Sequence, residues 1–176
     1  SLMQILAGSG RVRFMLVILP GLGIFSVGAK IYYLLSPVNY AEINISLRHK
    51  GPAVVDLGRV VYAENCASCH GVALEGQANW QQKDADGYLP APPLDETGHT
   101  RHHPDSYFFL MTKYGIEEMI GKLYPNKMPT YEDKLTDEEI LAVLSYIKSI
   151  WSGRIRRQHN QINAHAKAQQ ENCYDV

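Results

Sequence analysis

The apolar positions of the chain form one long uninterrupted run and several shorter periodic segments. The run extends from Phe14 to Ala29, and continuing it through Lys30 to Leu35 gives 22 residues, or about 33 Å of helix. The charged end of the lysine can reach the interface, so a helix of this length can span a bilayer. The pattern therefore predicts a single N-terminal transmembrane helix, and residues 1–35 are assigned to this anchor.

A cleaved secretory signal is the alternative interpretation of this segment. Arg11 and Arg13 precede the apolar run, and the small residues of "VGA" stand before Lys30, in the order typical of a signal peptide. In both cases the two arginines stay on the cytoplasmic side and the rest of the chain crosses the membrane. With the anchor retained, the sequence predicts a single-pass protein of the bacterial inner membrane whose remaining residues face the periplasm.

Two segments outside the periodic region are polar or mixed. Residues 36–55 lack a sustained period and contain turn residues, so they are predicted to be a short tether. Residues 153–176 are rich in Gln, Asn and Ala and form a polar C-terminal tail, either a weakly amphipathic helix through Ile155 and Ile162 or a mobile chain. Cys173, the odd thiol of this tail, is expected to have no role, with a bond to another chain in an oxidising compartment as the alternative.

Three segments between these flanks have the period of amphipathic helices. In the strongest, Thr136–Trp151, Thr136 and Glu139 form a capping box, and apolar residues recur every three or four positions. A second helix is predicted over "DLGRVVYAEN", where Gly58 indicates a close contact, with the first helix as the candidate partner. The third is predicted from "PDSYFFLMTKYG", with proline at its start and glycine at its end.

Composition and charge narrow the classes of function. With 176 residues, 45% hydrophobic and 20% charged, the chain has room for one ordinary globular domain with appendages. The net charge is +4 over residues 1–55, −7 over residues 56–152 and +2 over residues 153–176. No stretch combines basic residues with interleaved aromatic residues, so a nucleic-acid binder is excluded.

The sharpest chemical signal is "CASCH", which places two thiols and an imidazole within five positions. A structural zinc site needs four nitrogen or sulfur ligands, and the only other cysteine lies near the C-terminus. A thioredoxin-like redox pair belongs in a βαβ unit, which the helical patterns do not supply. The motif matches covalent haem attachment, in which Cys66 and Cys69 add to the vinyl groups of the haem, giving haem c, and His70 binds the iron.

The region from Asp56 to Trp151 resembles a class I cytochrome c domain. Besides CASCH, the resemblance rests on "GRVVY", "APPL" and "NKMP", the last followed by a C-terminal helix. It implies an all-α fold around one covalently attached haem c, and residues 56–152 are assigned to this haem domain. It also implies that Tyr146 and Ile147 lie where the C-terminal helix crosses the glycine of "GRVVY".

The resemblance further implies the surroundings of the iron. His70 and Met128 are the axial ligands, and the carbonyl of Pro92 accepts a hydrogen bond from the imidazole. A neutral thioether raises the reduction potential of the iron, which suits an electron carrier. Of the other methionines, Met111 is predicted to lie in the core, and Met119 falls in the short ambiguous segment "GIEEMIGKL".

Two further features have more than one interpretation. His99, His102 and His103 are predicted to lie in a polar loop, with ligation of the iron or of a copper ion as the alternatives. Trp80 lies in the long polar stretch of residues 71–91, where it either hydrogen-bonds a haem propionate or packs within the loop. This stretch is also a candidate docking surface or cover for the haem edge.

Together these features predict a membrane-tethered monohaem cytochrome c that transfers single electrons between membrane-bound or periplasmic redox proteins. No residue is needed as an acid, base or nucleophile, so neither an enzyme in isolation nor a small-molecule substrate is expected. Two alternatives stay open. One is a fixed haem c subunit of a larger membrane oxidoreductase, such as a terminal oxidase or a dehydrogenase. The other is a haem sensor with an open iron site.

Overall fold

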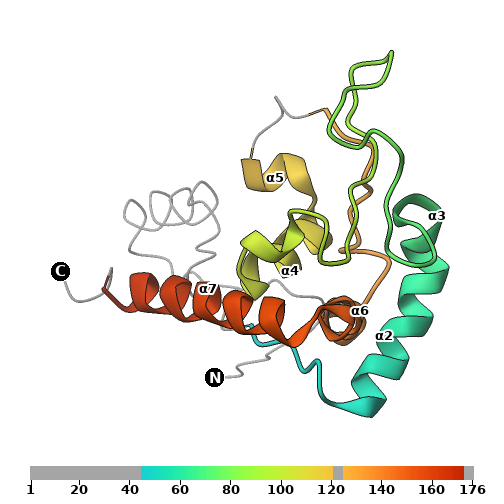
Figure 1. Ribbon diagram of the computed structural model, residues 1–176. Helices are drawn as coiled ribbons and strands as arrows, with labels where there is room; N and C mark the ends of the chain where they lie inside the picture. Colours follow the sequence, from blue (N-terminus) through green and yellow to red (C-terminus); the bar gives the residue numbers. More distant parts are fainter. Residues whose placement is uncertain (1–44, 121–124, 173–176) are drawn as a thin grey trace, which may run out of the picture. The chain divides into compact units, whose positions relative to one another are not determined.

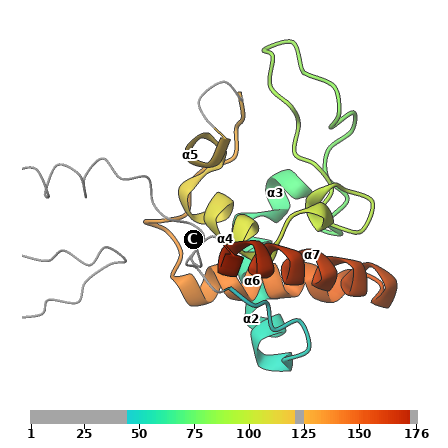
Figure 2. The same cartoon turned by 90° about the vertical axis from the view of Figure 1, so that its left-hand side faces the viewer.

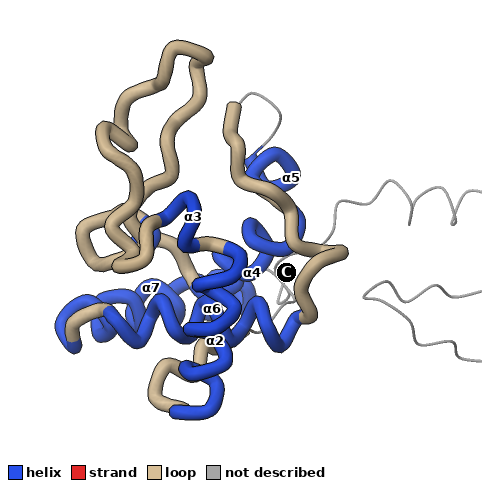
Figure 3. The backbone as a smooth tube through the Cα atoms, turned by 90° about the vertical axis from the view of Figure 1, so that its right-hand side faces the viewer, coloured by secondary structure: helices blue, strands red, loops and turns tan. Residues whose placement is uncertain are grey.

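The computed structural model describes residues 45–120 and 125–172, which belong to one compact unit, residues 40–176. Its elements, in chain order, are α2 (Pro52–Asn65), α3 (Ala67–His70), the short 3₁₀ helix η2 (Thr100–His102), α4 (Asp105–Tyr114), α5 (Ile116–Ile120), α6 (Asp137–Ile150) and α7 (Gly153–Asn172). Within these described residues no strand forms, so the all-α expectation is confirmed (Figures 1 and 3).

The predicted membrane anchor, residues 1–35, lies outside the described residues, as does Cys173. In the part of the chain that the structure describes, every helix is too short or too polar to cross a membrane. The anchor therefore stays a prediction from the sequence.

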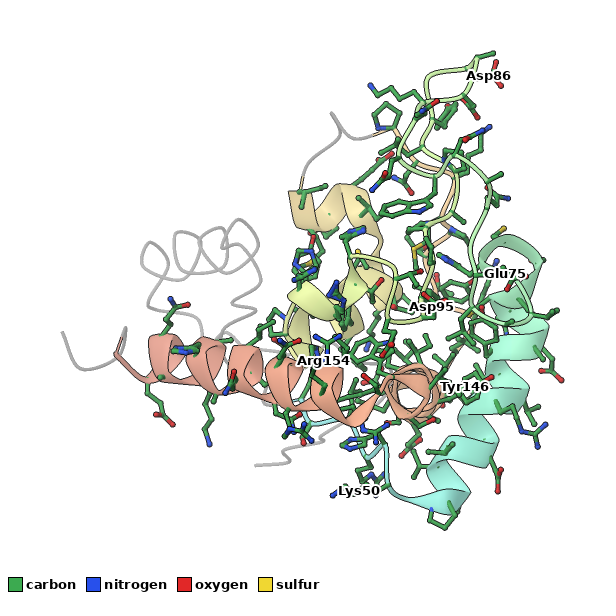
Figure 4. All side chains as sticks on the ribbon, viewed as in Figure 1. Lys50, Glu75, Asp86, Asp95, Tyr146 and Arg154 are labelled. Atoms are coloured by element: carbon green, nitrogen blue, oxygen red, sulfur yellow. The ribbon has the colours of Figure 1, made fainter. Side chains whose placement is uncertain are left out.

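Helices α2 and α6 form the central packed pair of the domain (Figure 1). A Cβ atom added to Gly58 would lie 2.0 Å from the carbonyl oxygen of Ala142 and 2.8 Å from Cβ of Tyr146, so only glycine fits there. The rings of Tyr62 and Tyr146 pack beside this point with centroids 5.5 Å apart, and Figure 4 shows Tyr146 on the side of α6 that faces α2. The predicted crossing at Gly58 is confirmed, and Ile147 is buried in the core.

Helix α6 has the capping box that the sequence predicts. Oγ1 of Thr136 accepts a hydrogen bond from the Glu139 N–H at 3.2 Å, and a carboxylate oxygen of Glu139 accepts one from the Thr136 N–H at 2.8 Å. The apolar face of α6 is buried, and the indole of Trp151, at the C-cap, donates to the carbonyl of Leu94 at 2.9 Å. The helix thus serves as the base on which the loops near the haem motif are fixed.

The first helix begins earlier than the sequence pattern indicates. Pro52 occupies its first turn, where a missing N–H costs nothing, so the helix takes up the last four residues of the predicted tether. The preceding residues also pack on the domain, because Leu47 N–H donates to Asp105 at 3.1 Å and Arg48 N–H donates to Ser145 at 3.0 Å. These partners are distant in sequence and leave no local pattern.

The C-terminal tail forms helix α7, one of the two interpretations that the sequence left open, and it runs along one side of the domain (Figure 2). Two of its own side chains, those of Ile155 and His159, are buried. Nε2–H of His159 donates to the carbonyl of His103 at 2.8 Å, and the side-chain oxygen of Asn163 accepts from the Asp105 N–H at 2.7 Å. Helix α7 is therefore docked at the start of α4.

A buried charged cluster joins these elements. The Asp105 carboxylate lies 3.2 Å from Nζ of Lys148 and accepts the N–H of Leu47, and Nδ1 of His159 is 3.6 Å away. Burial, followed by the charge of Lys148, lowers the pKa of His159, so the ring is neutral near pH 7. The cluster connects the segment before α2, through the N–H of Leu47, with α4, α6 and α7 through one carboxylate.

Candidate haem-binding site

The CASCH motif lies at the end of α2, where the chain continues into the one-turn helix α3. The N–H groups of Cys69 and His70 both donate to the carbonyl of Cys66, at 3.1 and 2.9 Å. This single turn places the two sulfur atoms and the imidazole close together. Both of the described cysteines, Cys66 and Cys69, are free thiols.

Burial and the neighbouring Cys69 raise the pKa of the Cys66 thiol to about 11. A thiol that acts in redox exchange has a lowered pKa, because the thiolate is the reactive form. The environment of Cys66 therefore does not suit a thioredoxin-like pair, the alternative considered from the sequence.

Two tyrosine hydroxyls hold the ends of this motif. Tyr62 donates to the carbonyl of Gly71 at 2.6 Å, just after the motif, and Tyr131 donates to the carbonyl of Asn65 at 2.7 Å, just before it. Burial raises the pKa of both hydroxyls, that of Tyr131 to about 12, so both remain donors at neutral pH. Sequence reasoning missed Tyr131, because its partner lies 66 positions away.

The imidazole of His70 is oriented by a backbone carbonyl. Its Nδ1 lies 2.8 Å from the carbonyl oxygen of Pro92, and since a carbonyl can only accept, Nδ1 carries the proton. This leaves Nε2 as the nitrogen that can bind a metal. Burial lowers the pKa of His70, which favours the neutral ring that a metal ligand requires.

The segment that presents Pro92 is held closely against the motif. Gly76 N–H donates to the carbonyl of His70 at 2.8 Å, and Leu94 N–H donates to that of Leu74 at 2.8 Å. A Cβ atom on Gly76 would lie 2.4 Å from the nitrogen of the next proline, Pro93. Backbone contacts therefore fix the hydrogen-bond partner of the imidazole.

The methionine that the sequence predicts as second ligand lies between α5 and α6. Met128 is half-buried, packs against the core, and donates its N–H to the side-chain oxygen of Asn126 at 3.0 Å. Met111 and Met119 are also half-buried against the core. Ligation of the iron by Met128 therefore stays a prediction from the resemblance.

The residues around the motif fit a haem. Several apolar side chains from separate segments pack against the buried core yet remain partly uncovered, as expected for the border of a large apolar group. They include Cys66, Leu94, Met111, Met119, Met128 and Leu135. Two free thiols and an imidazole with an available Nε2 supply the attachment chemistry. Nowhere in the described ranges do three His, Cys, Asp or Glu side chains gather in a way that suits a bare metal ion.

The histidine-rich loop lies in a series of ring contacts. Trp80 stacks on His99 with centroids 5.8 Å apart, and His103 stacks on Tyr107 at 4.4 Å. His102 lies 3.2 Å from a guanidinium nitrogen of its neighbour Arg101. These contacts support packing within the loop for Trp80 and the histidines, while the contact of Trp80 with a haem propionate stays a prediction.

Comparison with known proteins shows the family of this chain. Residues 55–151, more than half of the chain, match the family model for cytochrome c. The chain therefore belongs to the cytochrome c family, whose members carry covalently attached haem c and transfer electrons.

A curated relative gives a more particular comparison. The chain is 28% identical over 118 residues to the Cbb3-type cytochrome c oxidase subunit FixP of Bradyrhizobium sp. (strain ORS 278). The match covers 66% of this chain but only 37% of the relative, so the chain spans well under half of that protein. No solved structure gives a significant match.

Proposed function

We propose that this chain is a monohaem cytochrome c, tethered to the bacterial inner membrane, that carries single electrons between membrane-bound or periplasmic redox proteins. The observation that carries the proposal is the 2.8 Å hydrogen bond between Nδ1 of His70 and the carbonyl of Pro92. That bond leaves Nε2 free, and in a chain of this family Nε2 would then bind the iron of a haem attached at the same motif. Membership of the family supports electron transfer as the general role.

In the proposed function, the side chains and backbone of the protein attach the haem, bind its iron and tune its reduction potential. Cys66 and Cys69 would hold the haem through thioether bonds, and His70 and Met128 would bind the iron. The haem supplies one-electron chemistry when bound. The Pro92 carbonyl keeps Nδ1 protonated and the ring fixed, while the neutral sulfur of Met128 favours the ferrous state and raises the potential. With His70 and Met128 both bound to it, the iron would have no free position for a substrate, which would suit a carrier.

The test is the optical spectrum of the purified ferric protein, which in this proposal has the weak near-infrared charge-transfer band of methionine sulfur bound to haem iron. The band disappears in Met128→Ala and persists in Met111→Ala, a matched change at another half-buried methionine. The Met128→Ala protein also gains rapid binding of carbon monoxide in the ferrous state. Absence of the band from the wild-type protein would contradict the axial pair and favour a histidine ligand or an open site.

A fixed haem c subunit of a larger membrane oxidoreductase is the second candidate. The similarity to a subunit of a Cbb3-type cytochrome c oxidase favours it, although that match covers 37% of the relative. Purification of the full chain in mild detergent distinguishes the two candidates. Comigration with a haem or copper enzyme supports the fixed subunit, and an unaccompanied chain supports the mobile carrier.

A further inference from the structure

The stretch between His70 and Pro92 contains none of the proposed iron ligands and is given no role in the function proposed above. In the structure its residues 77–91 form a long loop that projects away from the packed helices (Figure 1). Asp86 lies at the tip of this loop, far from the crossing of α2 and α6 (Figure 4). The chain that leads to Met128 also extends in this direction and contacts the loop.

The base of the loop is closed by two hydrogen bonds. Gln77 N–H donates to the carbonyl of Ala91 at 2.8 Å, and the side-chain oxygen of Gln77 accepts from the Ala91 N–H at 3.0 Å. Ala91 is directly followed by Pro92, whose carbonyl contacts His70. The base of the loop therefore fixes the backbone on the His70 side of the site.

The tip of the loop is closed by Asp84. One oxygen of its carboxylate accepts the N–H groups of Asp86 at 3.0 Å and Tyr88 at 2.8 Å, and its own N–H donates to the carbonyl of Tyr88 at 2.8 Å. Gly87 permits the turn by adopting a φ of +84°. The second carboxylate oxygen of Asp84 remains available for a partner outside the loop.

That partner is Lys127, the residue directly before Met128. Its Nζ lies 3.0 Å from Asp84, 3.9 Å from the Asp86 carboxylate and 4.6 Å from the centroid of the Tyr88 ring. The cation is thus held by two carboxylates and an aromatic face at once. We call Asp84, Asp86, Tyr88 and Lys127 the clip.

We propose that the clip positions Met128, so that loop 77–91 joins the backbone on the two sides of the haem. The base of the loop ends at Ala91, which precedes Pro92, the residue whose carbonyl orients His70. The tip of the loop binds Lys127, which precedes Met128. This inference rests on Met128 being the distal ligand, as proposed above. A neutral thioether is a weak ligand, so a contact that keeps its backbone in place raises the fraction of time that it is bound.

The size of the effect follows from exposure. The Lys127 side chain is 60% exposed and that of Asp84 is 33% exposed, so solvent screens their attraction. Loss of an exposed ion pair of this kind corresponds to about a two- to fivefold change in an equilibrium. The clip therefore biases the position of Met128 without determining the fold.

The test uses the full-length protein with haem attached and measures the rate at which carbon monoxide binds to the ferrous form, because carbon monoxide enters only when Met128 leaves the iron. Asp84→Asn keeps an acceptor for the turn but removes the charge, and Lys127→Gln removes the opposite charge. Each raises the rate about two- to fivefold. Lys127→Arg keeps the charge and restores the wild-type rate. Lys83→Gln, the same change at an exposed lysine in the loop, leaves the rate unaltered.

The possible results separate this inference from the proposed function. Unchanged rates in Asp84→Asn and Lys127→Gln, with the methionine band present in the wild-type protein, overturn the clip and leave the axial pair intact. An equal rise in Lys83→Gln also overturns it, because the effect would then come from the general charge of the surface. A wild-type protein without the methionine band overturns the axial pair and the clip together. Unfolding followed by far-ultraviolet circular dichroism shows whether each variant retains its fold.

Discussion

The segments that carry the two predicted iron ligands are held in different ways. Around His70, backbone groups dominate, and the buried Leu74 adopts a φ of +63° and accepts the N–H of Leu94. Around Met128, side chains dominate, namely the amide of Asn126 and the ammonium of Lys127. Close backbone packing leaves no room for a larger residue, whereas solvent screens the exposed contact of Lys127, so its loss is expected to change the structure little. We call these two segments the His70 side and the Met128 side. The His70 side is held rigidly, whereas the position of the Met128 side can change more easily.

The largest expected effect is on the His70 side, at Gly76. This residue has a φ of +70°, and an added Cβ would lie 2.4 Å from the nitrogen of Pro93. Gly76→Ala combines left-handed strain with overlap against backbone that cannot move, so it is expected to lower the free energy of unfolding by about 3 kcal/mol. Urea unfolding of the haem protein measures this change.

Gly87, in the same stretch between His70 and Pro92, provides the matched control. Its φ is +84°, but no atom lies within 4 Å of an added Cβ. Gly87→Ala therefore carries the strain without the overlap and is expected to cost about 1 kcal/mol. Equal losses in the two alanine variants would contradict the idea that tight backbone packing fixes the His70 side.

Local chemistry accounts for what the sequence could predict. The thiols and imidazole of CASCH and the capping box of α6 depend on residues close together in the chain, and Gly58 stands out because a glycine inside a helix is unfavourable unless a neighbour comes close. The residues that meet Gly58, Ala142 and Tyr146, are distant in the chain, and Tyr146 is expected there only from the family resemblance. The docking of α7 depends instead on the contact of His159 with His103, and the clip on Asp84 and Lys127, which are 43 positions apart. Such long-range polar pairs have no period and no spacing, so no pattern in the sequence indicates them.

The contacts that dock α7 on the domain lie outside the segments of both His70 and Met128, so weakening them gives a reference for the two ligand segments. The pKa of His159 is lowered below its ordinary value of 6.5, first by burial and then by Lys148, against the opposing effect of Asp105. As the pH falls below about 6.5, His159 therefore becomes protonated in the unfolded chain before it does so in the folded chain. The contribution of His159 to the free energy of unfolding is complete above this pH and decreases as the pH falls, by up to about 1.4 kcal/mol per pH unit.

Urea unfolding at pH 7.5 and pH 5.5 measures this dependence. The difference between the two values is expected to be smaller in His159→Phe than in the wild-type protein, even though the variant loses the hydrogen bond to His103 at both pH values. His165→Phe, the same change at an exposed position of α7, retains the wild-type difference. Equal pH dependence in all three proteins would show that another group is responsible.

The smallest expected effect comes from removing the tyrosine hydroxyls that bind the two ends of CASCH, one in each of two variants. It distinguishes the His70 side from the Met128 side most directly. Tyr62→Phe and Tyr131→Phe each remove one hydrogen bond to a backbone carbonyl and are expected to cost about 0.5–1.5 kcal/mol of unfolding free energy. Tyr62 lies in α2 and its hydroxyl reaches Gly71, next to His70, whereas Tyr131 follows Met128 by three positions and connects its segment to Asn65. Only Tyr131→Phe should therefore speed the binding of carbon monoxide to the ferrous protein. If both variants bound it equally fast, the Met128 side would be no more adjustable than the His70 side.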